Sequence, residues 1–275
     1  MKFTISREAM LKPLNLVAGV VERRQTLPIL ANVLMVLEGD RLSMTGTDLE
    51  VELVGRVQLP EAGESGEVTV PARKLVDICK SLPEGSDIQI AVQDGKAMVR
   101  SGRSRFTLST LPAREYPNVE DSMGTHQFKI LQGQLKRLID RTAFAMAQQD
   151  VRYYLNGMLW ELGGKQLRVV ATDGHRLALC TLPEKVDTDG DTQVILPRKG
   201  VLELARLLLD EDAEVAVVIG SNHIRATTND FTFTSKLVDG KFPDYQRVLP
   251  RSPDKIVLGS RLELRQAFTR TAILS

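Results

Sequence analysis

The chain has 275 residues, of which 43% are hydrophobic and 26% are charged, and its net charge at pH 7 is +1. This composition describes a soluble globular protein, and the length fits about two domains. No run of about 18 apolar residues occurs, which excludes a transmembrane helix. The start, MKFTISREAMLK, lacks the apolar stretch of a signal peptide. We therefore expect a cytoplasmic protein that is not bound to a membrane.

Two kinds of periodicity alternate along the chain. Apolar residues at helical spacing predict five helices, over residues 7–19, 71–82, 133–147, 197–209 and 260–272. Apolar and polar residues alternate, with Gly or Asp-Gly turns between the runs, over 42–47, 49–57, 88–101 and 167–182, and this pattern predicts antiparallel strands. Pro13 lies inside the first helix and should kink it. Helices packed on antiparallel strands indicate the α+β class.

The sequence repeats itself at an offset of 125 or 126 residues. Thr47 and Asp48 recur as Thr172 and Asp173, and VPARKLVDICKSL (70–82) recurs as LPRKGVLELARLL (196–208). STLPAREYP (109–117) recurs as SKLVDGKFP (235–243). Because three matches follow in one order at nearly one spacing, the chain contains two copies of one module.

A third copy begins near the end of the chain. The stretch 256–275 has the same order of short strand, polar residue and amphipathic helix that opens the first two modules, and Arg141-Thr142-Ala143 recurs as Arg270-Thr271-Ala272. A strand and a helix cannot bury a core alone. We therefore expect a first domain over 1–124, a second over 125–252 and the start of a third over 253–275, in a chain truncated from a longer protein.

The predicted helices carry most of the positive charge. The four helices after the first hold twelve basic and four acidic residues, so the rest of a chain of net charge +1 is acidic. Like charges gathered on repeated helices favour a polyanion such as nucleic acid as partner. Ordinary solvated helix faces are the alternative. Arg100, Arg103 and Arg105 surround a Ser-Gly turn, where they either grip phosphates or are simply solvated. No base-reading motif accompanies them, so binding should not depend on sequence.

Asp173 and His175 lie two residues apart in VVATDGHRLALC and raise the question of catalysis. A hydrolase would need a nucleophile or a metal beside this pair, and no motif supplies one. His126 and His223 are isolated, and Cys79 and Cys180 are far apart in apolar segments. The alternatives are a hydrolase that uses Asp173 and His175, and a binding module that acts as these 275 residues alone. We expect a turn without catalytic, metal or cofactor sites.

The motifs TGTDLE, VPARK, RSGRSRFTLSTLP, QQDVRYYLNGM, ATDGHRLA, PRKG and SKLVDGKFPDYQRVLP occur in this order. Together they resemble the bacterial DNA polymerase III beta subunit, the family of replicative sliding clamps. The resemblance runs from Met1 to Ser275, but most of that family's third domain is missing. It implies a processivity factor that is not an enzyme. In the family, three similar domains form a protomer, and two protomers close head to tail into a ring around duplex DNA.

The resemblance also implies site residues. The residues implied to contact DNA are Arg24, Arg73, Arg103, Gln149, Tyr153 and Tyr154. Those for a pocket that takes partner peptides between the second and third domains are Arg152, Leu155, Thr172, Gly174, His175, Arg176, Leu177, Pro243, Arg247 and Val248. Those for the ring interface are Phe106, Leu108, Ile273 and Leu274.

The implied partners are duplex DNA, the polymerase III catalytic subunit, the clamp loader, other DNA polymerases, repair proteins and a second protomer, in the nucleoid of the cytoplasm. Half of the pocket lining and one side of the ring interface belong to the third domain. We therefore expect these 275 residues to bind peptides more weakly than the whole protein and not to form a stable closed ring.

Overall fold

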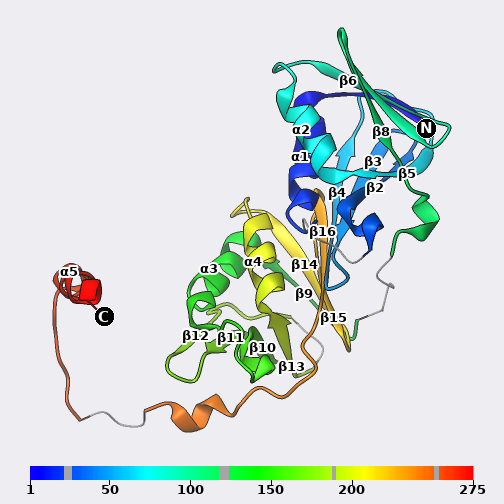
Figure 1. Ribbon diagram of the computed structural model, residues 1–275. Helices are drawn as coiled ribbons and strands as arrows, with labels where there is room; N and C mark the ends of the chain where they lie inside the picture. The colour runs from blue at the N-terminus through cyan, green and yellow to red at the C-terminus, as the bar shows by residue number, and fades with distance from the viewer. Residues whose placement is uncertain (22–26, 118–123, 188–189, 251–253, 275) are drawn as a thin grey trace. The chain divides into compact units, whose positions relative to one another are not determined.

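The computed structural model describes all residues except 22–26, 118–123, 188–189, 251–253 and 275. It divides into two compact units, Met1–Lys241 and Phe242–Ser275, and each is described by itself. The larger unit contains both sequence modules, so the boundary between residues 124 and 125 stays a prediction. Figure 1 labels the helices and strands in chain order.

The first module pairs two helices with eight strands in its described residues. The helices are α1 (Arg7–Ala18) and α2 (Ala72–Ser81). The strands are β1 (Lys2–Ser6), β2 (Asn32–Glu38), β3 (Arg41–Thr47), β4 (Val51–Gln58), β5 (Gly66–Pro71), β6 (Asp87–Gln93), β7 (Lys96–Ser101) and β8 (Ser104–Ser109). Short 3-10 turns form η1 (Pro28–Ala31) and η2 (Ala113–Glu115).

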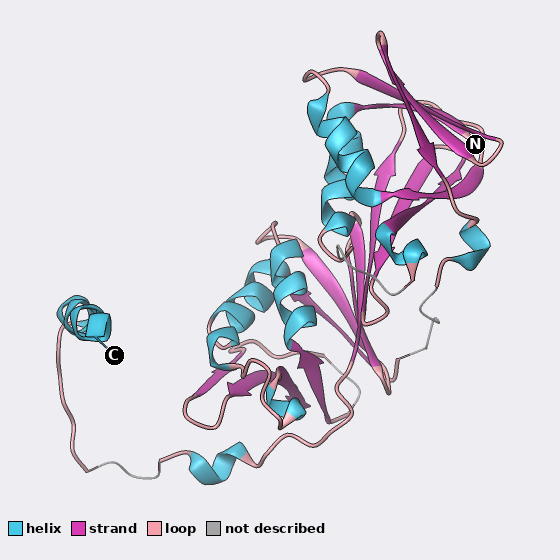
Figure 2. Cartoon of the chain, viewed as in Figure 1, coloured by secondary structure: helices cyan, strands magenta, loops and turns pink. Residues whose placement is uncertain are grey.

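The second module repeats this order. Its helices are α3 (Gln132–Asp140) and α4 (Arg198–Leu207). Its strands are β9 (His126–Leu131), β10 (Gly157–Gly163), β11 (Gln166–Thr172), β12 (Leu177–Thr181), β13 (Thr192–Pro197), β14 (Glu214–Ile219), β15 (His223–Thr227) and β16 (Phe231–Lys236). The 3-10 turns η3 (Ala143–Ala145) and η4 (Tyr153–Leu155) follow α3. The helix pairs lie beside the strands in both modules (Figure 2).

The sheets show the duplication directly. One four-stranded sheet has the order β1-β6-β7-β8, and another has the order β12-β11-β10-β13. The third sheet, β5-β2-β3-β4-β16-β15-β14-β9, joins four strands of each module. The joint is the antiparallel pair β4–β16, with Val51 opposite Ser235 and Gly55 opposite Phe231. The two modules therefore share one continuous sheet.

One apolar core runs through both modules. Its largest fully buried members include Leu14 of α1, Leu53 of β4, Trp160 of β10 and Phe233 of β16. Leu53 and Phe233 lie opposite each other across the joint. Burial of such side chains contributes roughly 1.5–3 kcal/mol each. The joint therefore adds apolar packing to its backbone hydrogen bonds.

One helix is shorter than the sequence predicts. The helix predicted over 133–147 ends at Asp140, because the buried hydroxyl of Thr142 donates to the carbonyls of Leu138 (2.8 Å) and Ile139 (3.4 Å) and satisfies the helix end. Pro13 lies inside α1, which is continuous from Arg7 to Ala18, and the kink expected there stays a prediction. Its ring packs on β4 at Gly55, where a Cβ would lie 2.9 Å from the Cβ of Pro13.

The second unit, Phe242–Ser275, contains little regular structure in its described residues. Tyr245–Val248 form the 3-10 turn η5, Arg261–Thr271 form helix α5, and Ala272–Leu274 form η6. The hydroxyl of Ser260 caps α5 by accepting from the amide of Glu263 (3.5 Å). Helix α5 thus lies within one residue of the predicted range, and its apolar residues Leu262 and Phe268 are exposed.

The joint between the modules also contains an ion pair, between Lys199 of α4 and Asp48 after β3. The side chain of Asp48 is 6% exposed. Asp48→Asn keeps the oxygen that caps its turn but removes the charge. We expect the free energy of unfolding to fall by about 1–3 kcal/mol, as for other lost charged hydrogen bonds, in urea unfolding.

Asp173→Asn is the matched control. It changes the repeat-related carboxylate, whose side-chain partner Arg176 is 59% exposed. Its effect on unfolding should be clearly smaller than that of Asp48→Asn, because solvent screens exposed pairs. Equal losses in the two variants would contradict a structural role for the Asp48–Lys199 pair.

Candidate functional site

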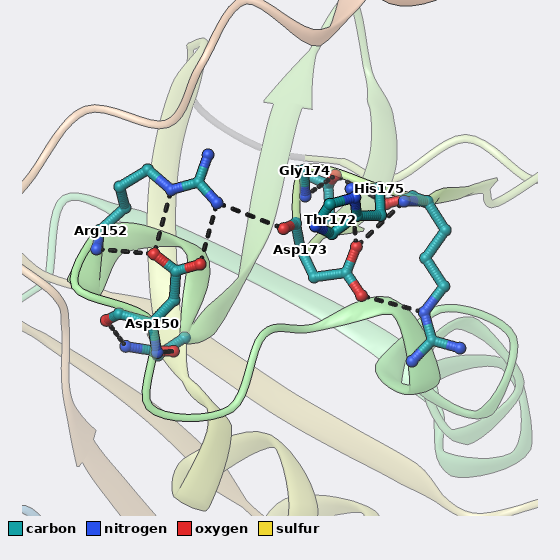
Figure 3. Close-up of polar contacts among 8 residues, drawn as sticks. Asp150, Arg152, Thr172, Asp173, Gly174 and His175 are labelled. Carbon is teal, nitrogen blue, oxygen red and sulfur yellow. Dashed lines mark hydrogen bonds and ion pairs between the residues drawn. The ribbon is translucent and has the colours of Figure 1, made fainter.

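The turn between β11 and β12 is held by its own side chains (Figure 3). The Asp173 Oδ1 accepts from the amides of His175 (2.9 Å) and Arg176 (3.0 Å), and Oδ2 accepts from Arg176 Nε (3.1 Å). The Thr172 hydroxyl donates to the Arg176 carbonyl (2.7 Å) and accepts from the amide of Gly174 (3.1 Å). Gly174 has a φ of +88°, which favours glycine. The turn is therefore rigid and presents His175 to solvent.

The first module builds the same turn. The Asp48 Oδ1 accepts from the amides of Glu50 (2.9 Å) and Val51 (2.7 Å), and the Thr47 hydroxyl donates to the Val51 carbonyl (2.9 Å). Leu49 has a φ of +76°, at the position of Gly174. Since the repeat keeps Asp but replaces His175 by Glu50, the Asp-His pair is a structural turn with an exposed histidine at its tip.

A second loop supports this turn from η4. The Arg152 guanidinium donates Nε to Asp150 Oδ1 (3.0 Å) and Nη2 to Asp150 Oδ2 (2.9 Å), and it donates more weakly to the Asp173 carbonyl (3.4 Å). Asn156 exchanges two hydrogen bonds with the backbone of Asp150, each 2.9 Å long. A Cβ on Gly174 would lie 3.1 Å from Arg152 Nη2, so the glycine allows this close approach.

Both carboxylates of this site are strongly acidic. Hydrogen bonds from the Arg152 side chain and amide lower the pKa of Asp150 to about 2. Hydrogen bonds from the amides of Arg176 and His175 lower the pKa of Asp173 to about 2. Carboxylates held ionised by such bonds position the loops and do not act as general acids at neutral pH.

Apolar groups border the same surface. Leu155 is buried, with its amide bonded to the Arg152 carbonyl (2.8 Å), and Leu177 is half-buried opposite Thr172. The guanidinium of Arg176 lies 5.6 Å from the ring centre of Phe144, which is 58% exposed. This surface thus combines fixed backbone groups, two arginines and an exposed aromatic ring.

The structure brings together only part of the expected peptide pocket. Its residues from the larger unit lie on η4, the β11–β12 turn and β12: Arg152, Leu155, Thr172, Gly174, His175, Arg176 and Leu177. Pro243, Arg247 and Val248 lie in the second unit. There Arg247 Nε donates to Asp244 Oδ2 (2.8 Å), and Val248 is 69% exposed. The closed pocket therefore stays a prediction.

The residues expected at DNA lie on several elements. Arg73 is exposed on α2, and Arg103 is exposed in the β7–β8 turn. Gln149 has a φ of +57°. Tyr153 and Tyr154 form an edge-to-face pair at 5.7 Å, and Tyr153 is 56% exposed. Arg24 lies outside the described residues. The role of these residues in DNA binding stays a prediction.

The helices contribute fewer free cations than the sequence count suggests. Lys199 pairs with Asp48, Arg206 pairs with Glu203 at 2.8 Å, and Lys136 pairs with Asp140 at 3.6 Å. Among the helices of the larger unit, the basic residues that are exposed and form no ion pair in the described residues are Arg73, Lys74, Lys80, Arg137 and Arg141, on or just after α2 and α3. In the second unit, α5 carries three further exposed arginines, Arg261, Arg265 and Arg270.

The residues expected at a ring interface differ in exposure. β8 is an edge strand of its sheet, but Leu108 is buried and Phe106 is half-buried against the core. The apolar side chains of this edge strand therefore point inward, and Arg105 and Thr107 are exposed. The role of Phe106 and Leu108 at an interface stays a prediction. Ile273 and Leu274, in the second unit, are 76% and 96% exposed.

Other chemical features give no further site. Cys79 and Cys180 are free, and burial raises the pKa of the Cys79 thiol to about 11. Across the described residues, no group of three His, Cys, Asp or Glu side chains could hold a metal ion. None of the helices that the structure describes is long and apolar enough to span a membrane.

Family models match two stretches of the chain. The DNA polymerase III beta subunit N-terminal domain matches residues 1–120, and its central domain matches residues 129–244. The chain belongs to the DNA polymerase III beta subunit family. The beta sliding clamp of Pseudomonas aeruginosa PAO1 is 68% identical over 275 residues, which are 100% of this chain and 75% of that protein. The beta sliding clamp of Escherichia coli K12 is 55% identical over the same shares.

Solved structures agree with the family assignment. A crystal structure of the beta subunit from Pseudomonas aeruginosa has a TM-score of 0.97 at 67% identity and covers 99% of this chain and 74% of that one. The Bacillus subtilis sliding clamp has a TM-score of 0.94 at 30% identity, covering 100% and 74%. The α+β clamp fold is thus confirmed, and as a member of this family the chain acts in DNA replication as a processivity clamp and is not an enzyme.

Sequence reasoning missed the residues that support the pocket surface. Asp150 and Asn156 hold Arg152 in place, and Phe144 faces Arg176. The Asp-x-Arg spacing of residues 150 and 152 was the available signal, because a short acidic side chain often accepts from amides two residues on. Nothing local pointed to Phe144.

The low pKa of Asp150 gives a test of this loop. The folded-state value of about 2 lies below the ordinary 3.8, so the ionised form is favoured by folding. Its contribution is fully present above about pH 4 and is lost as the pH falls through about 2. In Arg152→Met, NMR titration of the carboxyl carbons should show the Asp150 pKa rising toward 3.8.

Asp173 provides the internal reference for this titration. Its pKa of about 2 depends first on the amides of Arg176 and His175, so it should change little in the same variant. An unchanged Asp150 midpoint in Arg152→Met would show that the guanidinium does not set that pKa.

Proposed function

We propose that the exposed cations of this beta subunit contact the phosphates of duplex DNA. The observation that carries this proposal is the division of the helix cations into two groups. Lys199 and Arg206 form ion pairs with carboxylates, whereas Arg73 and Arg137 are exposed and form no ion pair in the part of the chain that the structure describes. The proposed contact residues are Arg24, Arg73, Arg103, Gln149, Tyr153 and Tyr154, with Arg137 added from the structure.

Such contacts fit a clamp that must move along DNA. Phosphate contacts carry no base information and are readily exchanged through water, so they hold the duplex without fixing its register. The edge-to-face pair of Tyr153 and Tyr154 offers one exposed ring for stacking on an unpaired base. The closed ring then retains the clamp on the duplex, and the phosphate-contacting residues supply only electrostatic attraction.

Salt titration of DNA binding tests this proposal. Arg73→Ala should weaken binding equally for duplexes of unrelated sequence and reduce the slope of log K against log salt by about 1. Lys165→Ala is the control, because Lys165 is an exposed cation that lies in the β10–β11 turn and not on a helix. A preference above about tenfold among sequences at fixed salt would contradict phosphate-only contact.

We further propose that the surface formed by η4, the β11–β12 turn and β12 binds short hydrophobic peptide motifs of partner proteins. A rigid turn, two fixed arginines and the apolar border of Leu155 and Leu177 suit an apolar anchor with polar ends. Pro243, Arg247 and Val248 complete the proposed lining. A Pseudomonas aeruginosa relative has been crystallised with griselimycin, which supports ligand binding by this family.

The proposed partners follow from the family role. They are the polymerase III catalytic subunit, the clamp loader, other DNA polymerases and repair proteins. For the whole protein, we also propose that two protomers pair through Phe106 and Leu108 on one side and Ile273 and Leu274 on the other, at the nucleoid. Sedimentation velocity at micromolar concentration should show a dimer of the whole protein, and a monomer would contradict that pairing.

Peptide titration tests the proposed pocket. His175→Ala removes an exposed ring at the turn tip without touching the hydrogen bonds of Asp173, so folding should be unaffected. We expect calorimetry to show peptide affinity reduced by about three- to tenfold, the usual size for a contributing contact. Glu50→Ala, at the repeat-related turn, is the matched control and should leave affinity unchanged. Equal effects of the two variants would place the peptide elsewhere.

A further inference from the structure

The carboxyl end of α1 has no cation of its own. The last turn of α1 contains no basic residue, yet its unpaired carbonyls carry the negative end of the helix dipole. The cation comes from the other module: Arg206 of α4 donates Nη2 to the carbonyl of Leu16 (2.8 Å). An arginine 190 residues away in sequence thus caps the first helix.

The guanidinium of Arg206 is fixed in direction. Its Nε and Nη2 both donate to Glu203 Oε2, at 3.0 and 2.8 Å. The Glu203 side chain is 19% exposed, so water competes weakly for it. One turn of α4 therefore holds the planar group pointed at α1, and Nη2 serves both the carboxylate and the Leu16 carbonyl.

Gly19, which follows α1, makes room for this contact. A Cβ at Gly19 would lie 2.8 Å from Arg206 Cζ and closer still to Nη2. The φ of Gly19 is −63°, an ordinary helical value that any residue adopts. The glycine is therefore required for close approach and not for backbone conformation.

A second cationic cap continues the arrangement. Lys136 of α3 donates Nζ to the carbonyl of Ala205, in the last turn of α4 (3.3 Å). The two caps run in series from α3 to α4 and from α4 to α1. Charged hydrogen bonds thus connect the middle of α3 to the end of α4, and α4 to the end of α1.

The sheet alone leaves the angle between the modules loosely defined. Adjacent strands twist by roughly 10° to 35°, so one strand pair permits a range of module orientations. A contact far from the β4–β16 axis restricts that range more than another hydrogen bond within the ladder. Arg206 makes such a contact, on the helix layer.

We propose that Arg206 is a positioning residue that sets the angle between the first and second modules by capping α1. It acts through Leu16 and Glu203, and Gly19 is its steric partner. This inference does not depend on the DNA or peptide residues proposed above. Its consequence for the clamp is that this cap helps to set the curvature of the helix layer.

Distance measurement by pulsed electron paramagnetic resonance tests the proposal in the 275-residue chain. Spin labels go on Lys74→Cys of α2 and Arg137→Cys of α3, both exposed positions on helices. Cys180→Ala removes the half-buried native thiol, while Cys79 is 0% exposed and out of reach of the label. The parent protein should give one narrow distance distribution.

Arg206→Met keeps an unbranched apolar stem but removes the guanidinium, so it cannot donate a hydrogen bond. We expect it to broaden the distribution about twofold or more, while the thermal midpoint of the chain, followed by circular dichroism, changes little. Gly19→Ala should broaden it similarly, because the new methyl displaces the guanidinium. The double variant should be no broader than either single variant, since both remove the same contact.

Lys80→Met is the matched control. Lys80 holds the position of Arg206 in the first module at the 126-residue offset, with Asp77 in place of Glu203, and it is exposed on α2. Its distribution should equal that of the parent. Three results would each overturn the proposal. The first is a distance distribution in Arg206→Met that is as narrow as that of the parent. The second is a Gly19→Ala protein that is more stable than the parent and has an equally narrow distribution, and the third is a Lys80→Met distribution as broad as that of Arg206→Met.

Discussion

The pairing of β4 with β16 is the interaction on which the rest of the larger unit depends. It joins strands of two modules into one sheet and places Leu53 opposite Phe233 in a shared core. It also brings Asp48 to Lys199 and α1 to the end of α4. Without this strand pair, each of these side-chain contacts would have to order two independent bodies, at an entropic cost that no single ion pair offsets.

The duplication explains how one turn serves two purposes. The Thr-Asp turn has the same internal hydrogen bonds at residues 47–51 and 172–176. In the first module its carboxylate is covered by α4, and in the second it faces Arg176 and Arg152 on an accessible surface. The residues that fold the turn are shared, and the neighbours decide whether it becomes a joint or a binding surface.

Local features of the fold could be predicted from the sequence because they depend on near neighbours. Periodicity located α2, α4 and α5 to within two residues, and the repeat predicted the equivalence of the modules. The end of α3 could not be predicted, because it depends on the buried hydroxyl of Thr142. The β4–β16 joint could not be predicted either, since alternation shows that a strand exists but not which distant strand it pairs with.

The same limit applies to the candidate site. The family resemblance assigned Arg152 and the 172–177 turn to one pocket, and the structure places them on one surface. It did not reveal Asp150 and Asn156, whose role is to hold Arg152. Charge counting also treated Arg206 and Lys199 as free cations, because sequence shows a charge but not the carboxylate that meets it after folding.

The shared sheet has a consequence for synthesis on the ribosome. β4 is made early, but its partner β16 follows only after roughly 180 further residues, so the outer edge of β4 emerges long before β16 can cover it. At about 5–20 residues per second, that edge stays open for about 10–40 seconds. An open strand edge is a template for pairing with other chains. Nascent chains on crowded polysomes are therefore the population in which this fold is most exposed to misassembly.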